Sequence, residues 1–191
     1  DTYIEQTSTL AFKGSRTAKG LELLVRKKDG YLRGWAAYNY GIVECEFPDL
    51  NGGKTFLADH DRTHELKSAI IWSFGPWNMA VTGLISSGRV YTPNNNLMVR
   101  IPENENANYT LVADSGTRNS KRLPIVHRID ISMTRSLRLL SKNCDIGISI
   151  FNVFNRRNIS HRSYNLTTDP FITTDIVMLG LTPTLSIRLE L

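Results

Sequence analysis

The chain has 191 residues, with 23 Lys and Arg against 18 Asp and Glu, so its formal net charge is +5, and 41% of its residues are hydrophobic. This apolar fraction is too high for a disordered chain, and two cysteines cannot supply a disulfide framework. No stretch reaches the roughly 18 consecutive apolar residues of a membrane helix, although the alternating strands of a membrane β-barrel escape that test. Because the basic residues are spread along the sequence, we expect no nucleic-acid partner.

The start of the sequence does not resemble a secretion signal. Asp1 opens directly into mixed polar sequence, without a basic region followed by an apolar one. The last residues up to Leu191, in contrast, show a structural pattern. We therefore expect either the mature form of a small protein or the tail of a longer one.

Apolar residues recur with period two along most of the chain, and period 3.6 hardly appears. This alternation predicts β-strands with one apolar and one polar face, in residues 21–26, 31–46, 64–74, 77–86, 128–134, 145–150 and 184–191. With their flanks these strands are roughly 10–15 residues long, more than the ~5–6 usual in soluble sheets, and a tilted strand needs ~9–11 residues to cross a bilayer core. The sequence predicts an all-β fold of about seven antiparallel strands that fit a membrane.

The connections between these segments alternate strictly between short and long. Three are tight and three are long and polar: the tight ones are Lys28-Asp29-Gly30, Gly75-Pro76 and residues 139–143, and the long ones are residues 47–63, 88–126 and 156–180. In an up-and-down meander, alternate connections lie at the same end of the sheet. A membrane β-barrel has this asymmetry, with short periplasmic turns and long external loops.

The aromatic residues agree with the membrane interpretation. Tyr31, Trp72, Phe74 and Trp77 gather at the predicted short-turn end, where an aromatic girdle would meet lipid headgroups. A soluble antiparallel sheet with one face on a core and one in water gives the same alternation. A soluble all-β ligand-binding domain therefore remains the alternative, and strand length and loop asymmetry favour the barrel.

Four stretches, in register, resemble the C-terminal barrel of TonB-dependent outer-membrane receptors. They are Gly20–Gly30 continued by Leu32–Tyr38, Phe47–Lys54, Asp61–His64, and Phe151–Asn158, and the resemblance extends from about Ser15 to Leu191. It implies an antiparallel transmembrane β-barrel of 22 strands, of which this chain, residues 1–191, contributes the last seven. The signal peptide, TonB box, plug and earlier strands would precede it, and lipid does not tolerate the two bare edges that seven strands alone would leave.

The resemblance also implies a function and its partners. It implies energised uptake of a scarce ligand across the outer membrane of a Gram-negative bacterium, by binding and gated passage. The implied partners are outer-membrane lipid and lipopolysaccharide, TonB acting through the preceding region, and the plug and remaining strands of the same receptor. We expect no cofactor and no enzymatic activity, since no Gly-x-Ser-x-Gly elbow occurs. A passive porin, which lacks a plug, is a further alternative.

Polar residues of the strands are the candidates for lining a watery lumen, because charges are costly against lipid but normal inside a barrel. They are Glu22, Asn39, Lys67, Thr82, Arg128, Asp130 and Arg188.

The long loops hold the candidates for ligand binding on the external side. They are Asp59, His60 and the basic cluster Arg118, Lys121 and Arg122, a cluster that could equally meet lipopolysaccharide phosphates or be solvated. His60 and His64 have the i, i+4 spacing of a helical metal site, but in a strand this spacing separates them by ~13 Å. We therefore predict structural hydrogen bonding in residues 59–65 and no metal site.

The two cysteines are predicted to lie at opposite ends of their strands, Cys45 at the long-loop end and Cys144 at the short-turn end. The separation across a membrane band far exceeds the ~7 Å between Cα atoms that a disulfide tolerates. We expect both to be unpaired.

Overall fold

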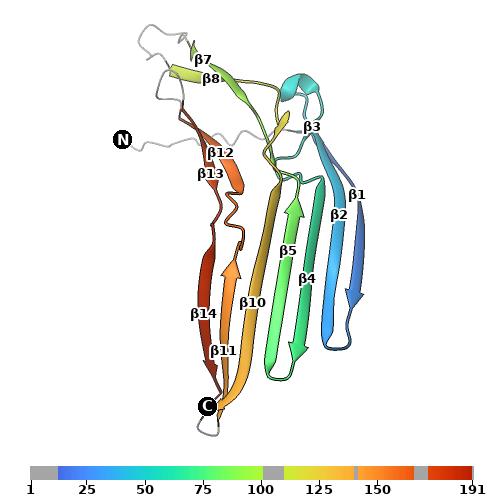
Figure 1. The fold of residues 1–191 in the computed structure, drawn as a ribbon. Helices are drawn as coiled ribbons and strands as arrows, with labels where there is room; N and C mark the ends of the chain where they lie inside the picture. Colours follow the sequence, from blue (N-terminus) through green and yellow to red (C-terminus); the bar gives the residue numbers. More distant parts are fainter. Residues whose placement is uncertain (1–12, 101–109, 140–141, 166–171, 191) are drawn as a thin grey trace, which may run out of the picture.

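The structure, a computed structural model, describes residues 13–100, 110–139, 142–165 and 172–190. Its main element is one antiparallel sheet in which each long strand pairs with the next along the chain (Figure 1). In order across the sheet these strands are β1 (Ser15–Lys27), β2 (Leu32–Glu46), β4 (His64–Phe74), β5 (Trp77–Ser86), β10 (Val126–Leu139), β11 (Lys142–Phe151) and β14 (Thr182–Leu189). No helix in the described ranges is long and apolar enough to cross a membrane.

The prediction of an all-β fold with antiparallel strands is confirmed. β4 and β5 have the predicted bounds, whereas β1, β10 and β11 extend beyond them because flanking polar residues continue the ladders. The last strand has eight residues, as predicted, but it begins two residues earlier, at Thr182, and ends at Leu189; Leu191 lies outside the described residues. The sheet is open, with β1 and β14 at its edges, and the described residues form no closed barrel.

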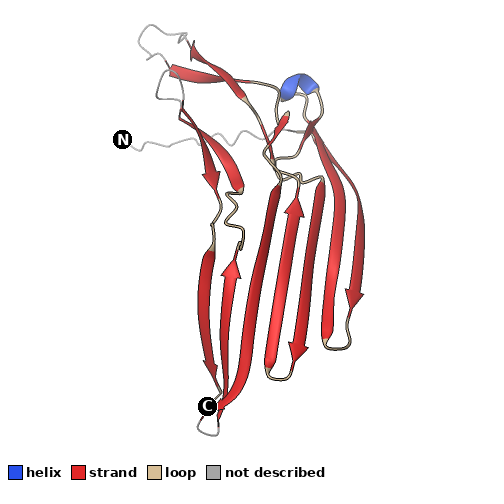
Figure 2. Ribbon diagram, in the orientation of Figure 1, coloured by secondary structure: helices blue, strands red, loops and turns tan. Residues whose placement is uncertain are grey.

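Tight turns join the long strands at one end of the sheet. Gly30, with φ 93°, closes the β1–β2 hairpin, and Gly75, with φ 52°, closes the β4–β5 hairpin. Left-handed φ values of this kind are open to glycine at no steric cost. The third predicted turn includes residues 140 and 141, which lie outside the described residues. The long connections gather at the opposite end (Figure 2).

The long connections contain strands of their own, which the sequence did not predict. The first holds a 3-10 turn, η1 (Asn51–Gly53), and β3 (Phe56–Leu57), which pairs with β2. The other two hold three further hairpins or ladders: β6 (Val90–Tyr91) with β9 (Lys121–Arg122), β7 (Asn94–Arg100) with β8 (Thr110–Ser115), and β12 (Ile159–Asn165) with β13 (Ile172–Val177). β3, β6 and β9 have two residues each, too few for a period of two to be visible.

The two faces of the sheet differ in polarity along every long strand. Residues directly opposite one another in neighbouring strands share a face. One such row is Leu185, Ile148, Met133, Met79, Trp72 and Leu32, and the adjacent row on the other face is Thr184, Ser149, Ser132, Ala80, Ile71 and Arg33. We refer to these as the apolar face and the polar face.

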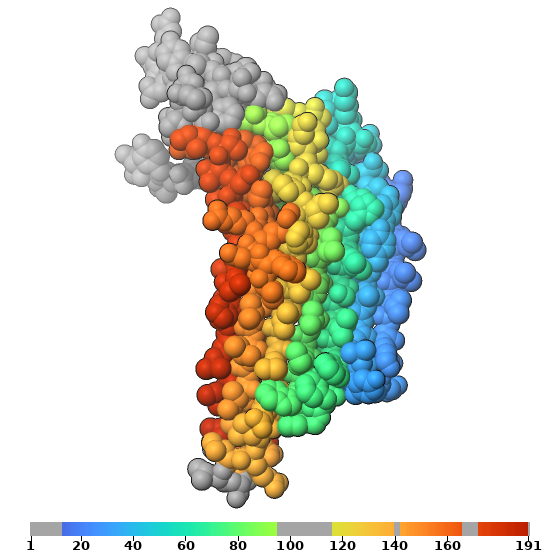
Figure 3. Space-filling view, viewed as in Figure 1, coloured from blue at the N-terminus to red at the C-terminus, as the bar shows by residue number. Residues whose placement is uncertain are grey.

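The long strands form a single layer. No described strand or helix lies across them in Figure 2, and Figure 3 shows them side by side from β1 in blue to β14 in red. Side chains of the apolar face are accordingly exposed, with Leu185 at 70%, Ile187 at 64% and Leu23 at 59%.

The buried apolar residues gather where the loops meet the sheet. Cys45, Phe56 and Ala58 form a cluster against which Val43 and Phe47 pack. At the other end of the sheet Cys144 is buried in β11, and both cysteines are free. The compact part of this molecule is therefore its loop end, and the long strands have no core of their own among the described residues.

Two glycines of β2 test the packing between strands. A Cβ on Gly34 would overlap the carbonyl oxygen of Ala69 in β4, whereas a Cβ on Gly41 would be 3.9 Å from its nearest atom, the carbonyl oxygen of Lys19. We expect Gly34→Ala to lower the free energy of unfolding by about 1–3 kcal/mol, because the backbones must move apart. Gly41→Ala serves as the control and should raise it by up to ~1 kcal/mol, since glycine is unfavourable inside a strand. Guanidinium unfolding followed by tryptophan fluorescence measures both, and equal effects would contradict the close approach.

Candidate functional site

The seven candidates for lining a lumen lie on the polar face. The ladder register places Glu22 opposite Asn39 and Thr82 opposite Asp130. The register of the ladders places the remaining candidates on the same face; they are Lys67, Arg128 and Arg188. The structure therefore brings all seven to one surface, and their lining of a closed lumen stays a prediction.

A hydrogen-bonded cluster around Asp130 occupies the middle strands of the polar face. Its Oδ2 accepts from Arg128 Nε at 3.0 Å and from Thr82 Oγ1 at 3.3 Å, and its Oδ1 accepts from the Asn152 N–H at 2.8 Å. The Arg128 guanidinium also lies 4.1 Å from the centroid of the Phe151 ring. Both charges are thus compensated within the protein, and they present a polar surface of little net charge.

Opposite charges also accompany each other elsewhere on the polar face. Lys67 Nζ lies 2.6 Å from Glu65 Oε1. Arg188 is opposite Asp145 in the ladder, and Asp145 Oδ1 accepts from Ser136 Oγ at 2.6 Å. Such a face is suited to contact with water and with polar solutes.

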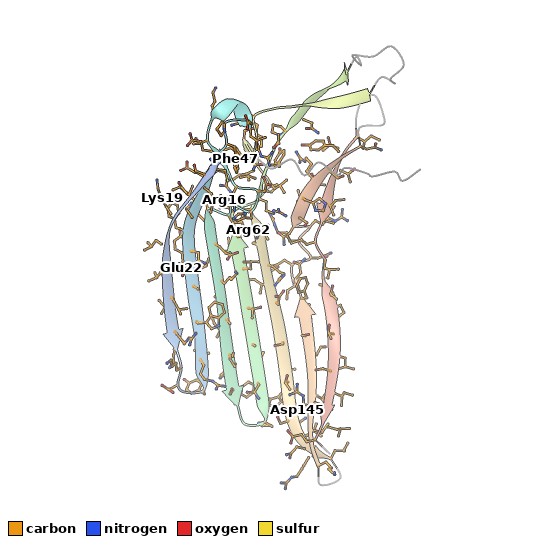
Figure 4. All side chains as sticks on the ribbon, turned by 180° about the vertical axis from the view of Figure 1, so that it is seen from behind. Arg16, Lys19, Glu22, Phe47, Arg62 and Asp145 are labelled. Atoms are coloured by element: carbon orange, nitrogen blue, oxygen red, sulfur yellow. The ribbon has the colours of Figure 1, made fainter. Side chains whose placement is uncertain are left out.

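A hollow of about 610 Å³ lies at the loop end of the polar face, between β1, β2 and the segment that enters β4. Its polar lining includes Glu22, Asn39, His60, Asp61, Arg62 and Glu65. Figure 4 shows Glu22 and Arg62 in this part of the molecule, and Asp145 near the opposite end. The volume falls in the range of small-molecule sites. Glu22 and His60, predicted as a lumen and a loop residue respectively, meet here.

Asp61 is the centre of the hydrogen bonding beside this hollow. It is 1% exposed; its Oδ2 accepts from the Val43 N–H at 2.9 Å, and its Oδ1 accepts from Thr63 Oγ1 at 3.0 Å and from Arg122 at 2.5 Å. Burial raises its pKa, but the hydrogen bonds from Arg122, Val43 and Thr63 outweigh burial and hold the pKa below its ordinary value. Structural hydrogen bonding in residues 59–65 is therefore confirmed. Within the part of the chain that the structure describes, no group of three or more His, Cys, Asp or Glu residues could hold a metal ion.

The predicted basic cluster mainly connects the second long loop to the first. Arg122 binds Asp61, and Arg118 lies over the Phe56 ring at 5.2 Å and 3.7 Å from Asp59 Oδ2. Lys121 is exposed in β9. Two of the three basic residues are thus occupied within the protein, and the exposed loop candidates Lys121, His60 and Asp59 are the more accessible, although Asp59 also contacts Arg118.

Asn119 is a residue of this junction that the sequence interpretation missed. It adopts a left-handed conformation with φ 51°, and its Nδ2 donates to Asp59 Oδ1 at 2.6 Å and to the Leu57 carbonyl at 2.7 Å. Asparagine is among the residues that tolerate this conformation. Its partners lie about 60 positions away, so no local signal identifies it.

Three asparagines at the outer end of β11 form a second junction that was also missed. Asn152 is buried with φ 54°, donates from Nδ2 to the carbonyls of Arg156 and Leu179 at 2.9 and 3.1 Å, and accepts the Arg156 N–H at 3.1 Å. Asn158 binds both backbone groups of His127, and Asn155 accepts the Leu181 N–H at 3.0 Å. The regular spacing of three asparagines in Phe151–Asn158 was the available signal. The side chains supply a turn that ends β11 and directs the chain towards β14.

The third long loop is attached to the second through β12 and β13. Arg162 binds both carboxylate oxygens of Asp175 at 2.7 and 3.0 Å and donates to the Tyr91 hydroxyl at 3.0 Å. The hydrogen bond from Arg162 holds the pKa of Asp175 below its ordinary value. The three long loops thus form one connected assembly at the loop end.

Comparisons with protein-family models, with curated proteins and with solved structures found no match to this chain. The chemistry of the site is therefore inferred from its own geometry. A charge-compensated polar face, a hollow at its loop end and a connected set of loops can hold a polar solute by hydrogen bonding.

We expect Asp61→Asn to loosen the loop junction. The carboxylate's partners include a charged arginine, and hydrogen bonds to charged groups contribute about 1.5–3 kcal/mol, so the free energy of unfolding should fall by about that amount. The depressed pKa of Asp61 means that its contribution is present at neutral pH and is lost as the pH falls below the ordinary value of 3.8. Denaturation at pH 7 and pH 3 measures this. Asp49→Asn, at an exposed loop carboxylate, is the control, and an equal effect of the two variants at pH 7 would contradict the assignment.

We expect Asn152→Ala to destabilise the turn that follows β11. It removes three half-buried hydrogen bonds, to the carbonyls of Arg156 and Leu179 and from the Arg156 N–H, and each such bond contributes about 0.5–1.5 kcal/mol. Limited proteolysis should show faster cleavage within residues 152–181. Arg157→Ala, at an exposed neighbouring position, is the matched control. Unchanged cleavage in Asn152→Ala would show that the backbone holds the turn without this side chain.

Proposed function

We propose that this chain is the C-terminal part of the transmembrane β-barrel of a TonB-dependent outer-membrane receptor, which takes up a scarce ligand with energy supplied through TonB. The observation that carries the proposal is the exposed apolar face of a single-layer sheet. Leu185 and Ile187 at the β14 edge, and Leu23 near the β1 edge, are all more than half exposed. Exposing apolar surface to water costs about 25 cal/mol of free energy per Å². If the hydrocarbon of a bilayer covered the apolar face, this cost would disappear along the whole face.

Strand length and turn placement support the same proposal. Six of the seven long strands have 10–15 residues, which meets the ~9–11 that a tilted strand needs to cross a bilayer core. The described tight turns lie at one end of the sheet and the long connections at the other (Figure 1). Membrane β-barrels have short turns on the periplasmic side and long loops outside.

The open edges determine what else the receptor needs. β1 and β14 each leave one row of backbone groups unpaired among the described residues, and unpaired backbone groups are not tolerated in hydrocarbon. Earlier strands of a longer chain, pairing with both edges, would close the barrel. This matches the resemblance noted in the sequence, which implies a 22-stranded barrel, a plug and a TonB box ahead of the present residues.

In this proposal the chain has two tasks. The loop assembly and the hollow beside Glu22 and His60 contribute to ligand capture on the external side. The polar face, with its paired Arg128 and Asp130, lines the passage that opens when TonB displaces the plug. Because the charges of that pair are compensated, a polar solute would form hydrogen bonds there and would not be bound tightly by an unpaired charge.

Two neighbouring positions of β14 test the proposal in the full-length protein. A spin label at Leu185→Cys should be accessible to oxygen dissolved in lipid, and one at Ser186→Cys should be accessible to a water-soluble nickel reagent, because the two side chains lie on opposite faces. Native Cys45 and Cys144 are replaced by Ala, and the receptor is reconstituted into phospholipid vesicles before electron paramagnetic resonance.

The alternatives give different results in the same experiment. A soluble all-β domain buries position 185 against a second layer, so neither reagent reaches it, and the protein does not enter the vesicles. A passive porin shows the lipid and water pattern but has no plug encoded upstream. Either result would contradict the proposed receptor.

A further inference from the structure

The charged residues on the apolar face have one sign near the tight turns. There this face carries Lys27, Arg135 and Lys142, whereas nearer the loops it carries both signs, Lys19 together with Glu44 and Glu46. Lys27 ends β1, Lys142 begins β11, and Arg135 lies four residues before the end of β10. The tight-turn end of the apolar strands is therefore purely basic, and Asp29 belongs to the adjoining turn.

These three cations are exposed side chains of the apolar face. None forms an ion pair with a residue that the structure describes. Lys27 Nζ donates to the Asp29 carbonyl at 3.1 Å, which uses one of its three hydrogens. The Arg135 guanidinium lies 5.1 Å from the Trp77 ring centroid and forms a cation–π contact with it. The N–H groups of the guanidinium lie in its own plane, so they can still donate hydrogen bonds to a ligand.

Aromatic side chains accompany the cations on the same face. Trp72 and Phe74 are exposed and have ring centroids 4.7 Å apart, and Trp77 is opposite Phe74 in the ladder. Tryptophan is suited to a boundary because its ring is apolar and its N–H reaches polar groups. We define these three aromatic residues with Lys27, Arg135 and Lys142 as the basic–aromatic belt.

The polar face at the same end carries both signs of charge. There Arg26, Arg33 and Arg138 occur together with the acidic residues Asp145 and Glu190. The one-signed charge is thus a property of the face that the proposed function assigns to lipid. A chain that needed positive charge only for solubility would have no reason to place it beside exposed tryptophan.

We propose that the basic–aromatic belt binds the anionic headgroups of phospholipids in the leaflet at the tight-turn end. This inference rests on the proposed function, because it needs the apolar face to lie in a bilayer. Phosphate groups match the three cations in charge and in hydrogen-bonding capacity. The acyl chains of the same lipids would cover Trp72, Phe74 and the apolar residues above them. A cation near an anionic lipid surface strengthens binding roughly fivefold.

The test compares the enrichment of an anionic and of a neutral phospholipid around the basic–aromatic belt of the full-length protein. The protein is reconstituted into phosphatidylcholine vesicles that contain a small fraction of dansyl-labelled phosphatidylglycerol or dansyl-labelled phosphatidylcholine. Energy transfer from tryptophan, which is present in the belt at positions 72 and 77, reports local lipid enrichment. We expect the anionic label to be enriched about fivefold or more over the neutral one, and to lose that enrichment at high salt.

A variant with Lys27→Gln, Arg135→Gln and Lys142→Gln should reduce the enrichment ratio to about one. The matched control, Arg26→Gln, Arg33→Gln and Arg138→Gln, removes three charges from the same end but from the polar face, and should keep the ratio. If the triple belt variant does not fold, the double variant Lys27→Gln and Lys142→Gln keeps the Arg135–Trp77 contact and should show a partial loss.

The outcomes separate this inference from the proposed function. A protein that inserts into both vesicles with a ratio of one, or a control variant that loses as much enrichment as the belt variant, overturns the belt and leaves the receptor proposal standing. Failure to insert into either vesicle overturns both.

Discussion

The structure depends on one constraint, which is that an antiparallel sheet satisfies its backbone hydrogen bonds within its own layer. β2, β4, β5, β10 and β11 each pair on both sides, so their N–H and C=O groups place no demand on the surroundings. The hydrogen bonds within the layer do not determine which molecules cover its two faces. One face is apolar and exposed along its length, so its stability depends on the medium that covers it, and in the proposed function that medium is a bilayer.

The two ends of the molecule are stabilised by different interactions. At the loop end, Cys45, Phe56 and Ala58 form a small core, and polar networks centred on Asp61 and Asn152 hold three long connections in place. The tight-turn end has two described glycine turns with left-handed conformations and few buried side chains. In the proposed receptor, a loop end held by these contacts suits a surface that presents binding groups, and the short turns reverse the chain beside the basic–aromatic belt.

The polar face and the hollow form one continuous surface on the inner side of the proposed barrel. The Arg128–Asp130 pair and the Lys67–Glu65 pair neutralise each other within the face, while Glu22 and His60 border the hollow at its loop end. Glu65 belongs to both, because it lines the hollow and pairs with Lys67. In the proposed receptor, the hollow would meet the ligand on the external side and the compensated pairs would line the passage.

The sequence alone determined the long strands, the two described tight turns and the assignment of each candidate to a face, because alternation and glycine turns are local signals. It also indicated that residues 59–65 serve hydrogen bonding. Only the tertiary structure showed that Arg122 is bound to Asp61, 61 positions away, and that Asn119 reaches Leu57, 62 positions away. It likewise revealed the short ladders within the loops. Such contacts depend on which loops the strands bring together in space, and the local periodicity of a sequence carries no information about contacts between residues about 60 positions apart.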